Sequence, residues 1–155
     1  MTQLTLQPDF AEMLEAFDEE QAEYVVVGAY AVAAHGHPRA TGDLDIFVRP
    51  SKANADKVWR ALVRFGAPLF DLTLDDLTTP GVVFQMGLPP VRIDLLTAID
   101  GVSFDEAWSS RMVVERDNLR IPVLGRETLL RNKRASGRPQ DLADVAALEG
   151  NAGEE

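Results

Sequence analysis

The sequence contains no cysteine among its 155 residues. This absence excludes disulfides, thiolate metal sites and cysteine nucleophiles, and a small domain without disulfides is typical of the cytoplasm. Aromatic residues make up only 7% of the chain, so its core must rest mainly on Leu, Val, Ile and Ala. No apolar run approaches the roughly 20 residues that span a bilayer. The N-terminus lacks a basic segment followed by an apolar stretch, so neither a membrane span nor a signal peptide is predicted.

Positive charge is also scarce, because 15 basic residues face 25 acidic ones and the formal net charge is −10. Such a surface repels a nucleic-acid backbone, which argues against a broad, salt-driven nucleic-acid binder. Many of the basic residues fall within 111–138, where they either hold phosphates on one face or lie on solvated surfaces. They are Arg111, Arg116, Arg120, Arg126, Arg131, Lys133, Arg134 and Arg138.

The chain length fits one domain, which we place over residues 1–148, followed by a disordered acidic tail over 149–155. Hydrophobic periodicity and turn residues predict the elements. Helices are expected from Pro8 onward and over 29–35, 52–65, 103–109, 126–135 and 139–149; strands are expected over 24–27, 44–48, 82–86, 91–95, 112–114 and 119–123. This order predicts an α/β (α+β) fold, in which a mixed β-sheet carries packed helices and two helices end the domain.

The sharpest local feature is the segment Thr41–Val48, which reads TGDLDIFV. Because side chains alternate along a strand, Asp43 and Asp45 point to one side while Leu44 and Ile46 face the core. Two ionised carboxylates at this spacing repel, so a raised pKa or a bound cation must offset the repulsion. Oxygen ligands alone suit Mg²⁺ or Mn²⁺ better than zinc. The alternative is a pair of solvated acids on an edge strand.

A third acid, Asp94, lies within the apolar run Val91–Leu96. An acid in a buried strand rarely lacks a partner. If this strand neighbours 44–48, Asp94 completes a site of three carboxylates. The alternative is an ion pair, for example with Arg92, or an acid at the strand end.

The first predicted strand ends at Gly28-Ala29, where a helix follows. A glycine at this place lets the backbone approach a phosphate, and the start of a helix favours an anion. Taken alone, the same pattern is an ordinary turn.

Together, these segments resemble the nucleotidyltransferase superfamily with the DNA polymerase β-like catalytic core. That family has a glycine at a strand end, then a Dh[D/E]h motif in which h is hydrophobic, then a lone carboxylate on a later strand. Gly28-Ala29, Asp43-Leu44-Asp45-Ile46 and Asp94 stand at these places. The stretch 133–145, KRASGRPQDLADV, is similar to a segment of small bacterial members related to the AbiEii/AbiGii toxin family and of minimal nucleotidyltransferases. The resemblance covers roughly residues 24–148.

The resemblance implies a metal-dependent enzyme that moves a nucleotidyl group from an NTP to a hydroxyl acceptor. Asp43, Asp45 and Asp94 would be catalytic and would hold Mg²⁺ or Mn²⁺, with Asp94 also activating the acceptor. The implied nucleotide-binding residues are Gly28, Ala29, Arg39, Thr41, Lys133 and Asp141, while Asp144 is expected to be structural. The acceptor would be an RNA end such as tRNA, a protein or a small molecule, and a toxin of this kind would have an antitoxin partner. The oligomeric state is left open.

One residue departs from the family pattern, because Ala29 stands where the family has Gly or Ser. A backbone contact survives this change, whereas a serine hydroxyl contact does not. The second hypothesis is therefore a non-catalytic nucleotide- or partner-binding module on the same fold. A haloacid-dehalogenase-type phosphatase fits poorly, since Asp43 precedes its apolar run instead of ending it. His35 and His37 lack a clustered third ligand and are expected to lie in a solvated loop.

Overall fold

The computed structural model describes residues 6–37, 42–88, 90–116 and 118–153. Within these ranges the strands are β1 (Tyr24–Val27), β2 (Asp43–Val48), β3 (Val83–Leu88), β4 (Val91–Leu96), β5 (Met112–Arg116) and β6 (Leu119–Val123). The helices are α1 (Pro8–Glu19), α2 (Gly28–Ala34), α3 (Lys52–Phe65), α4 (Phe104–Ser109), α5 (Arg126–Ser136) and α6 (Pro139–Gly153), with a short 3₁₀ turn η1 (Asp76–Thr78).

The described strands form one mixed six-stranded sheet in the order β3-β4-β2-β1-β6-β5. Strand β2 pairs antiparallel with β1 and parallel with β4, while β1 pairs parallel with β6. Strands β3 and β4 form an antiparallel pair, as do β5 and β6. The predicted α+β architecture is therefore confirmed, and β2 lies in the interior of the sheet.

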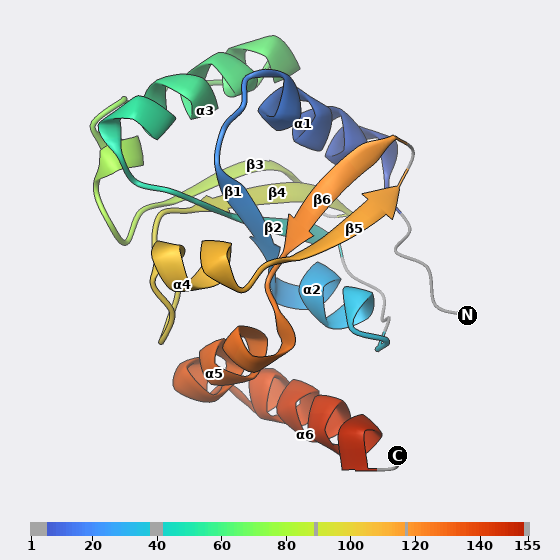
Figure 1. The fold of residues 1–155 in the computed structure, drawn as a ribbon. Coiled ribbons are helices and arrows are strands. Elements are labelled where there is room, and N and C mark those ends of the chain that lie inside the picture. Colours follow the sequence, from blue (N-terminus) through green and yellow to red (C-terminus); the bar gives the residue numbers. More distant parts are fainter. Residues whose placement is uncertain (1–5, 38–41, 89, 117, 154–155) are drawn as a thin grey trace.

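Helices cover both faces of this sheet. Helices α1 and α3 lie on one face, and α2, α4, α5 and α6 lie on the other (Figure 1). The predicted apolar stripe of α1 is buried, since Phe10, Met13, Leu14 and Phe17 are each at most 1% exposed. Helix α3 begins after its N-cap Ser51, whose hydroxyl accepts a hydrogen bond from the Asn54 backbone N–H. These two helices cover one face of the sheet and bury the core on that side.

Residues 66–80 form a loop with one helical turn, η1, whose Leu77 is buried in the core. The C-terminal tail differs from the sequence prediction. Helix α6 continues to Gly153, so residues 149–153 of the predicted disordered tail are helical, and residues 154–155 lie outside the described ranges. Gly150 does not adopt the left-handed backbone that often ends a helix, so it does not stop α6.

None of the helices in the described part of the chain is long and apolar enough to cross a membrane.

Candidate active site

The turn at the end of β1 brings the backbone against the acids of β2. The register of the β1–β2 pair places Val27 opposite Asp45. Gly28 follows Val27 with a φ of +70°, a conformation that side chains disfavour. A Cβ atom on Gly28 would lie 2.2 Å from Oδ2 of Asp45. Only glycine therefore allows this close approach of turn and carboxylate.

The parallel register of β2 and β4 assembles the acids. It places Asp43 opposite Arg92 and Asp45 opposite Asp94. Because side chains two residues apart share a face of a strand, these four side chains lie together on one face of the sheet. Asp94 is 7% exposed. The expectation that strands 44–48 and 91–95 are neighbours is confirmed, and the alternative of acids on an edge strand is wrong because β2 lies in the sheet interior.

Arg92 connects two of these acids. Its Nη2 donates to Oδ2 of Asp43 at 2.9 Å, and its Nε donates to Oδ1 of Asp94 at 3.1 Å. Nη2 also lies 3.3 Å from Oδ2 of Asp94. The ion pair of Asp94 with Arg92, considered from the sequence as an alternative to a cluster, thus exists inside the cluster. The contact with Asp43 was not foreseen, because only the strand register brings the two residues together.

The electrostatics of the site centre on Asp45. Burial raises the pKa of its carboxyl from the ordinary value of 3.8, and the neighbouring charges of Asp94 and Asp43 raise it further. The positive charges of Lys133 and Arg92 oppose this effect only in part, so the pKa of Asp45 is about 6. Without an added cation, the cluster therefore holds the ionised form of Asp45 at a free-energy cost.

We expect Asp45→Asn to stabilise the protein in EDTA at pH 7.5, by on the order of 2 kcal/mol. The native state retains a proton on Asp45 between about pH 4 and 6 that the unfolded chain has lost, so the contribution of Asp45 to wild-type stability falls as pH rises through this window. The difference between the two proteins should therefore disappear at pH 4. Denaturant unfolding of both proteins at both pH values measures this difference in stability.

Asp75→Asn is the control, because Asp75 is an exposed acid. It should change stability by less than about 0.5 kcal/mol at either pH. An Asp45→Asn variant no more stable than wild type at pH 7.5 would contradict the prediction.

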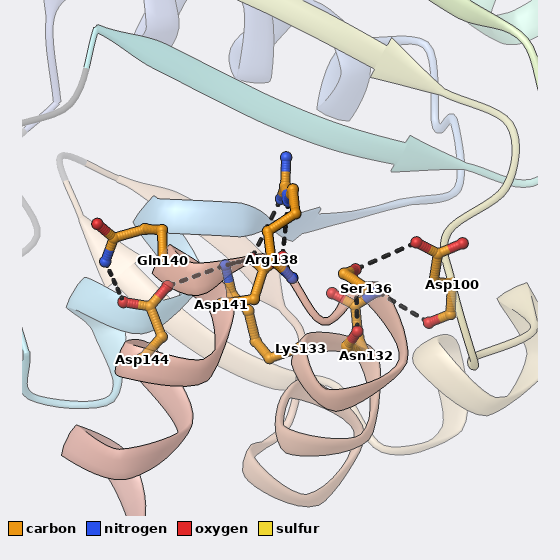
Figure 2. A network of polar contacts seen from close by, with 8 residues as sticks. All are labelled: Asp100, Asn132, Lys133, Ser136, Arg138, Gln140, Asp141 and Asp144. Atoms are coloured by element: carbon orange, nitrogen blue, oxygen red, sulfur yellow. Dashed lines mark hydrogen bonds and ion pairs between the residues drawn. The ribbon is translucent and has the colours of Figure 1, made fainter.

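Helices α5 and α6 face the acids with a second polar cluster, drawn in Figure 2. Lys133 of α5 is 4% exposed, and its Nζ lies 3.2 Å from Oδ1 of Asp141 and 3.1 Å from Oδ2 of Asp144. Asp141 and Asp144 are 1% and 4% exposed. Asp144 also accepts a hydrogen bond from Gln140 at 3.1 Å. The Lys133 charge, expected from the sequence to act on phosphate, is thus already paired with two buried acids.

Arg138 connects this cluster to the surface. Its Nε and Nη2 donate to the two carboxylate oxygens of Asp141 at 2.6 and 3.1 Å, while its side chain is 75% exposed. Burial alone would raise the pKa of Asp141, but hydrogen bonds from Arg138 and Lys133 outweigh it and hold the pKa below its ordinary value. Asp141 therefore stays ionised and pairs with Lys133.

Two cavities with shared walls lie between the carboxylates and the C-terminal helices. One of about 300 Å³ is lined by Asp45, Leu96 and Ile99, among others. The other, of about 340 Å³, includes Ala29 and Asp43 in its lining. Both are also lined by Gly28, Asp45, Lys133, Arg138 and Asp141. The fold therefore joins the glycine turn, two of the acids and the C-terminal motif around one hollow.

Sequence reasoning missed several residues of this hollow. Asn132 donates to the Asp100 carbonyl at 2.9 Å, and the Ser136 hydroxyl donates to the Asp100 carboxylate at 3.2 Å (Figure 2). All three residues line the 300 Å³ cavity. Asp100-Gly101 gave only a turn signal, so nothing local marked it. The candidates Arg39 and Thr41 lie outside the described residues.

His35 does not take part in this site. Its Nε2 lies 2.8 Å from the carbonyl oxygen of Leu124. This contact ties the end of α2 to the segment after β6, so the ring has a structural role instead of the solvated one expected from the sequence.

No protein-family model matches the chain, and no curated protein matches it either. Among solved structures, it is similar to that of a presumed nucleotidyltransferase from Thermotoga maritima, with a TM-score of 0.56 and 17% sequence identity. The similarity covers 97% of each chain. The chain has the nucleotidyltransferase fold. This fold spans nearly the whole sequence, including both C-terminal helices. At 17% identity the comparison supports the fold and nothing finer.

Whether a divalent cation fits this nucleotidyltransferase fold depends on the donors and on their placement. As they stand, no three Asp, Glu or His side chains within the described ranges are gathered in a geometry that holds a metal ion. The guanidinium of Arg92 takes oxygens of Asp43 and Asp94 instead. Three carboxylates on two paired strands are nevertheless the donors that Mg²⁺ or Mn²⁺ prefers. The donor set therefore has the chemistry of a Mg²⁺ or Mn²⁺ site, while two of its three acids are held in an ion-pair arrangement by Arg92.

Proposed function

We propose that this protein is a metal-dependent nucleotidyltransferase, which transfers a nucleotidyl group from an NTP to a hydroxyl acceptor. The observation that carries the proposal is the placement of Asp43, Asp45 and Asp94 on paired strands, beside a hollow bounded by Gly28 and Lys133. The similarity to a presumed nucleotidyltransferase supports the general class of reaction.

The three carboxylates would hold Mg²⁺ or Mn²⁺ through their oxygens. When bound, the cation supplies positive charge to the phosphate oxygens and to the leaving pyrophosphate. The acceptor oxygen forms a bond to the α-phosphorus while the bond to pyrophosphate breaks. Asp94, directly opposite Asp45, is our candidate for activating the acceptor hydroxyl.

The hollow offers separate places for the parts of the nucleotide. The backbone at Gly28 and Ala29 lies beside Asp45, where it can approach phosphate oxygens. Arg138 adds a largely exposed positive charge at the rim, and Lys133 adds a buried one. The 300 Å³ cavity beyond Asp45, with Leu96, Ile99 and Asn132 in its lining, is a place for the nucleoside.

The acceptor in this proposal is an RNA end, a protein or a small molecule. The C-terminal stretch 133–145 supports a link to AbiEii-like toxins. In that case an antitoxin would be the partner, and the protein would act in the cytoplasm.

A second candidate is a non-catalytic nucleotide- or partner-binding module. One observation favours it: Arg92 already neutralises two of the acids that a metal ion would need. Ala29, in place of Gly or Ser, agrees with it.

Thermal unfolding with Mg²⁺ and each non-hydrolysable NTP tests the proposal. A nucleotide at about 100 times its dissociation constant adds about 2.7 kcal/mol of stability, which is a rise of roughly 5–10 °C in Tm for a domain of this size. We expect this rise to need the metal and to vanish in Asp43→Asn/Asp45→Asn. It should persist in Asp71→Asn/Asp75→Asn, which removes two exposed acids of the 66–80 segment.

If no NTP shifts the wild-type Tm, the proposal fails. If an NTP binds with metal but radiolabelled NTP transfers no label to any component of a cell extract, the non-catalytic module replaces it.

A further inference from the structure

Arg92 lies among the three acids of β2 and β4 and is the one positively charged residue on their shared strand positions. The four residues form an array, with Asp43 opposite Arg92 and Asp45 opposite Asp94. Three of its four positions are acids, and all four side chains lie on one face of the sheet. Arg92 contacts one acid of its own strand and one of the neighbouring strand, at 3.1 and 2.9 Å. It is therefore the internal counter-ion of the array.

The contacts of Arg92 use oxygens that a metal ion would need. They involve Oδ2 of Asp43 and both carboxylate oxygens of Asp94. A divalent cation held by the same acids requires oxygens from each of them. The guanidinium and the cation cannot both occupy these oxygens, so binding of one displaces the other.

The Arg92 side chain has a way out of the site. Releasing the acids requires the guanidinium to move away from them. The side chain is 30% exposed, whereas the side chain of its partner Asp94 is 10% exposed. The acid is thus fixed by the strand, while the long arginine stem can swing toward solvent.

We infer that Arg92 occupies the carboxylate site in the absence of metal, and that a divalent cation enters by displacing it, so that Arg92 sets the metal affinity of the site. This inference rests on the proposed function, because it takes the three acids to be metal ligands. Charge-assisted hydrogen bonds must break before the cation binds, so free metal binds weakly. Removing the guanidinium removes that competition.

The test is Mn²⁺ binding to the full chain by isothermal titration calorimetry, without nucleotide. We expect Arg92→Gln to bind Mn²⁺ about ten-fold or more tightly than wild type, because the cost of breaking charged hydrogen bonds is absent. Arg60→Gln is the matched control, since Arg60 pairs with Glu20 between α3 and α1, away from the acids. It should leave Mn²⁺ affinity unchanged. Adding Asp43→Asn to Arg92→Gln should abolish the gain.

A second readout does not depend on metal affinity. In EDTA, Arg92→Gln should have a lower Tm than Arg60→Gln, because Asp43 and Asp94 lose their ion pairs with Arg92, and Mn²⁺ should reverse the loss. If Arg92→Gln does not fold, Arg92→Lys is the second variant. Lysine keeps the positive charge but cannot contact Asp43 and Asp94 together as the guanidinium does. We expect it to bind Mn²⁺ with an affinity above that of wild type.

The outcomes separate the two proposals. Equal Mn²⁺ affinity in wild type and in the Arg92 variants overturns the inference and leaves the metal site of the proposed function in place. If neither wild type nor the Arg92 variants bind Mn²⁺, both the metal site and the inference fall.

Discussion

Replacing Lys133 with methionine is expected to lower the free energy of unfolding by about 3 kcal/mol, because it leaves two buried carboxylates without their shared cation. Lys133 is 4% exposed and lies between Asp141 and Asp144, which are buried to a similar degree. Breaking a buried pair costs up to about 5 kcal/mol. We expect the lower part of that range because Arg138 still contacts Asp141, and Gln140 still contacts Asp144. Denaturant unfolding at neutral pH measures the loss.

Arg134→Met is the control for this substitution. Arg134 lies next to Lys133 on the same helix, but its ion pair with Glu149 is half exposed on both sides. Exposed ion pairs contribute about 0–1 kcal/mol, so this variant should remain close to wild type. A loss in Lys133→Met no larger than in Arg134→Met would mean that the buried cluster does not hold α5 and α6 together.

Gly28→Ala is expected to destabilise the protein by about 2–4 kcal/mol, since the new methyl adds a clash to an unfavourable backbone conformation. The added Cβ would lie 2.2 Å from Oδ2 of Asp45, so either the turn or the carboxylate must shift. The turn and the carboxylate are both neighbours of the proposed phosphate site, so a shift of either changes that site. The variant should therefore also lose the nucleotide-dependent rise in Tm.

Gly36→Ala separates the clash from the backbone effect. Gly36 also has a left-handed φ, of +100°, but a Cβ there would meet no heavy atom within 4 Å. We expect this variant to lose only about 1 kcal/mol, the backbone contribution. If the two glycine variants lose equal stability, the contact with Asp45 is not what requires a glycine at the end of β1.

The sequence predicts most of the fold because its local patterns agree with the packing. The stripe of α1 has helical periodicity, and β1 is a short continuous run of β-branched residues with all four positions buried. The end of α6 was predicted poorly, because the polar stretch after Leu148 carries only a weak local signal for a helix.

The site was predictable only in part. The alternation of Asp43-Leu44-Asp45 follows from strand geometry, so the shared face of the two acids could be read directly. The glycine at the end of β1 gave a turn signal, but nothing local indicated that its missing Cβ makes room for Asp45.

The sequence by itself determined the elements, the shared face of Asp43 and Asp45, and the acid buried in the run Val91–Leu96, since each depends on residues close together in the chain. Only the tertiary structure decided which of these residues meet. The parallel register of β2 and β4 places Arg92 against Asp43, which lies 49 positions away, and the packing of α6 on α5 buries Lys133 between two acids. Pairings over such distances arise from strand register and helix packing, which no local pattern of residues encodes.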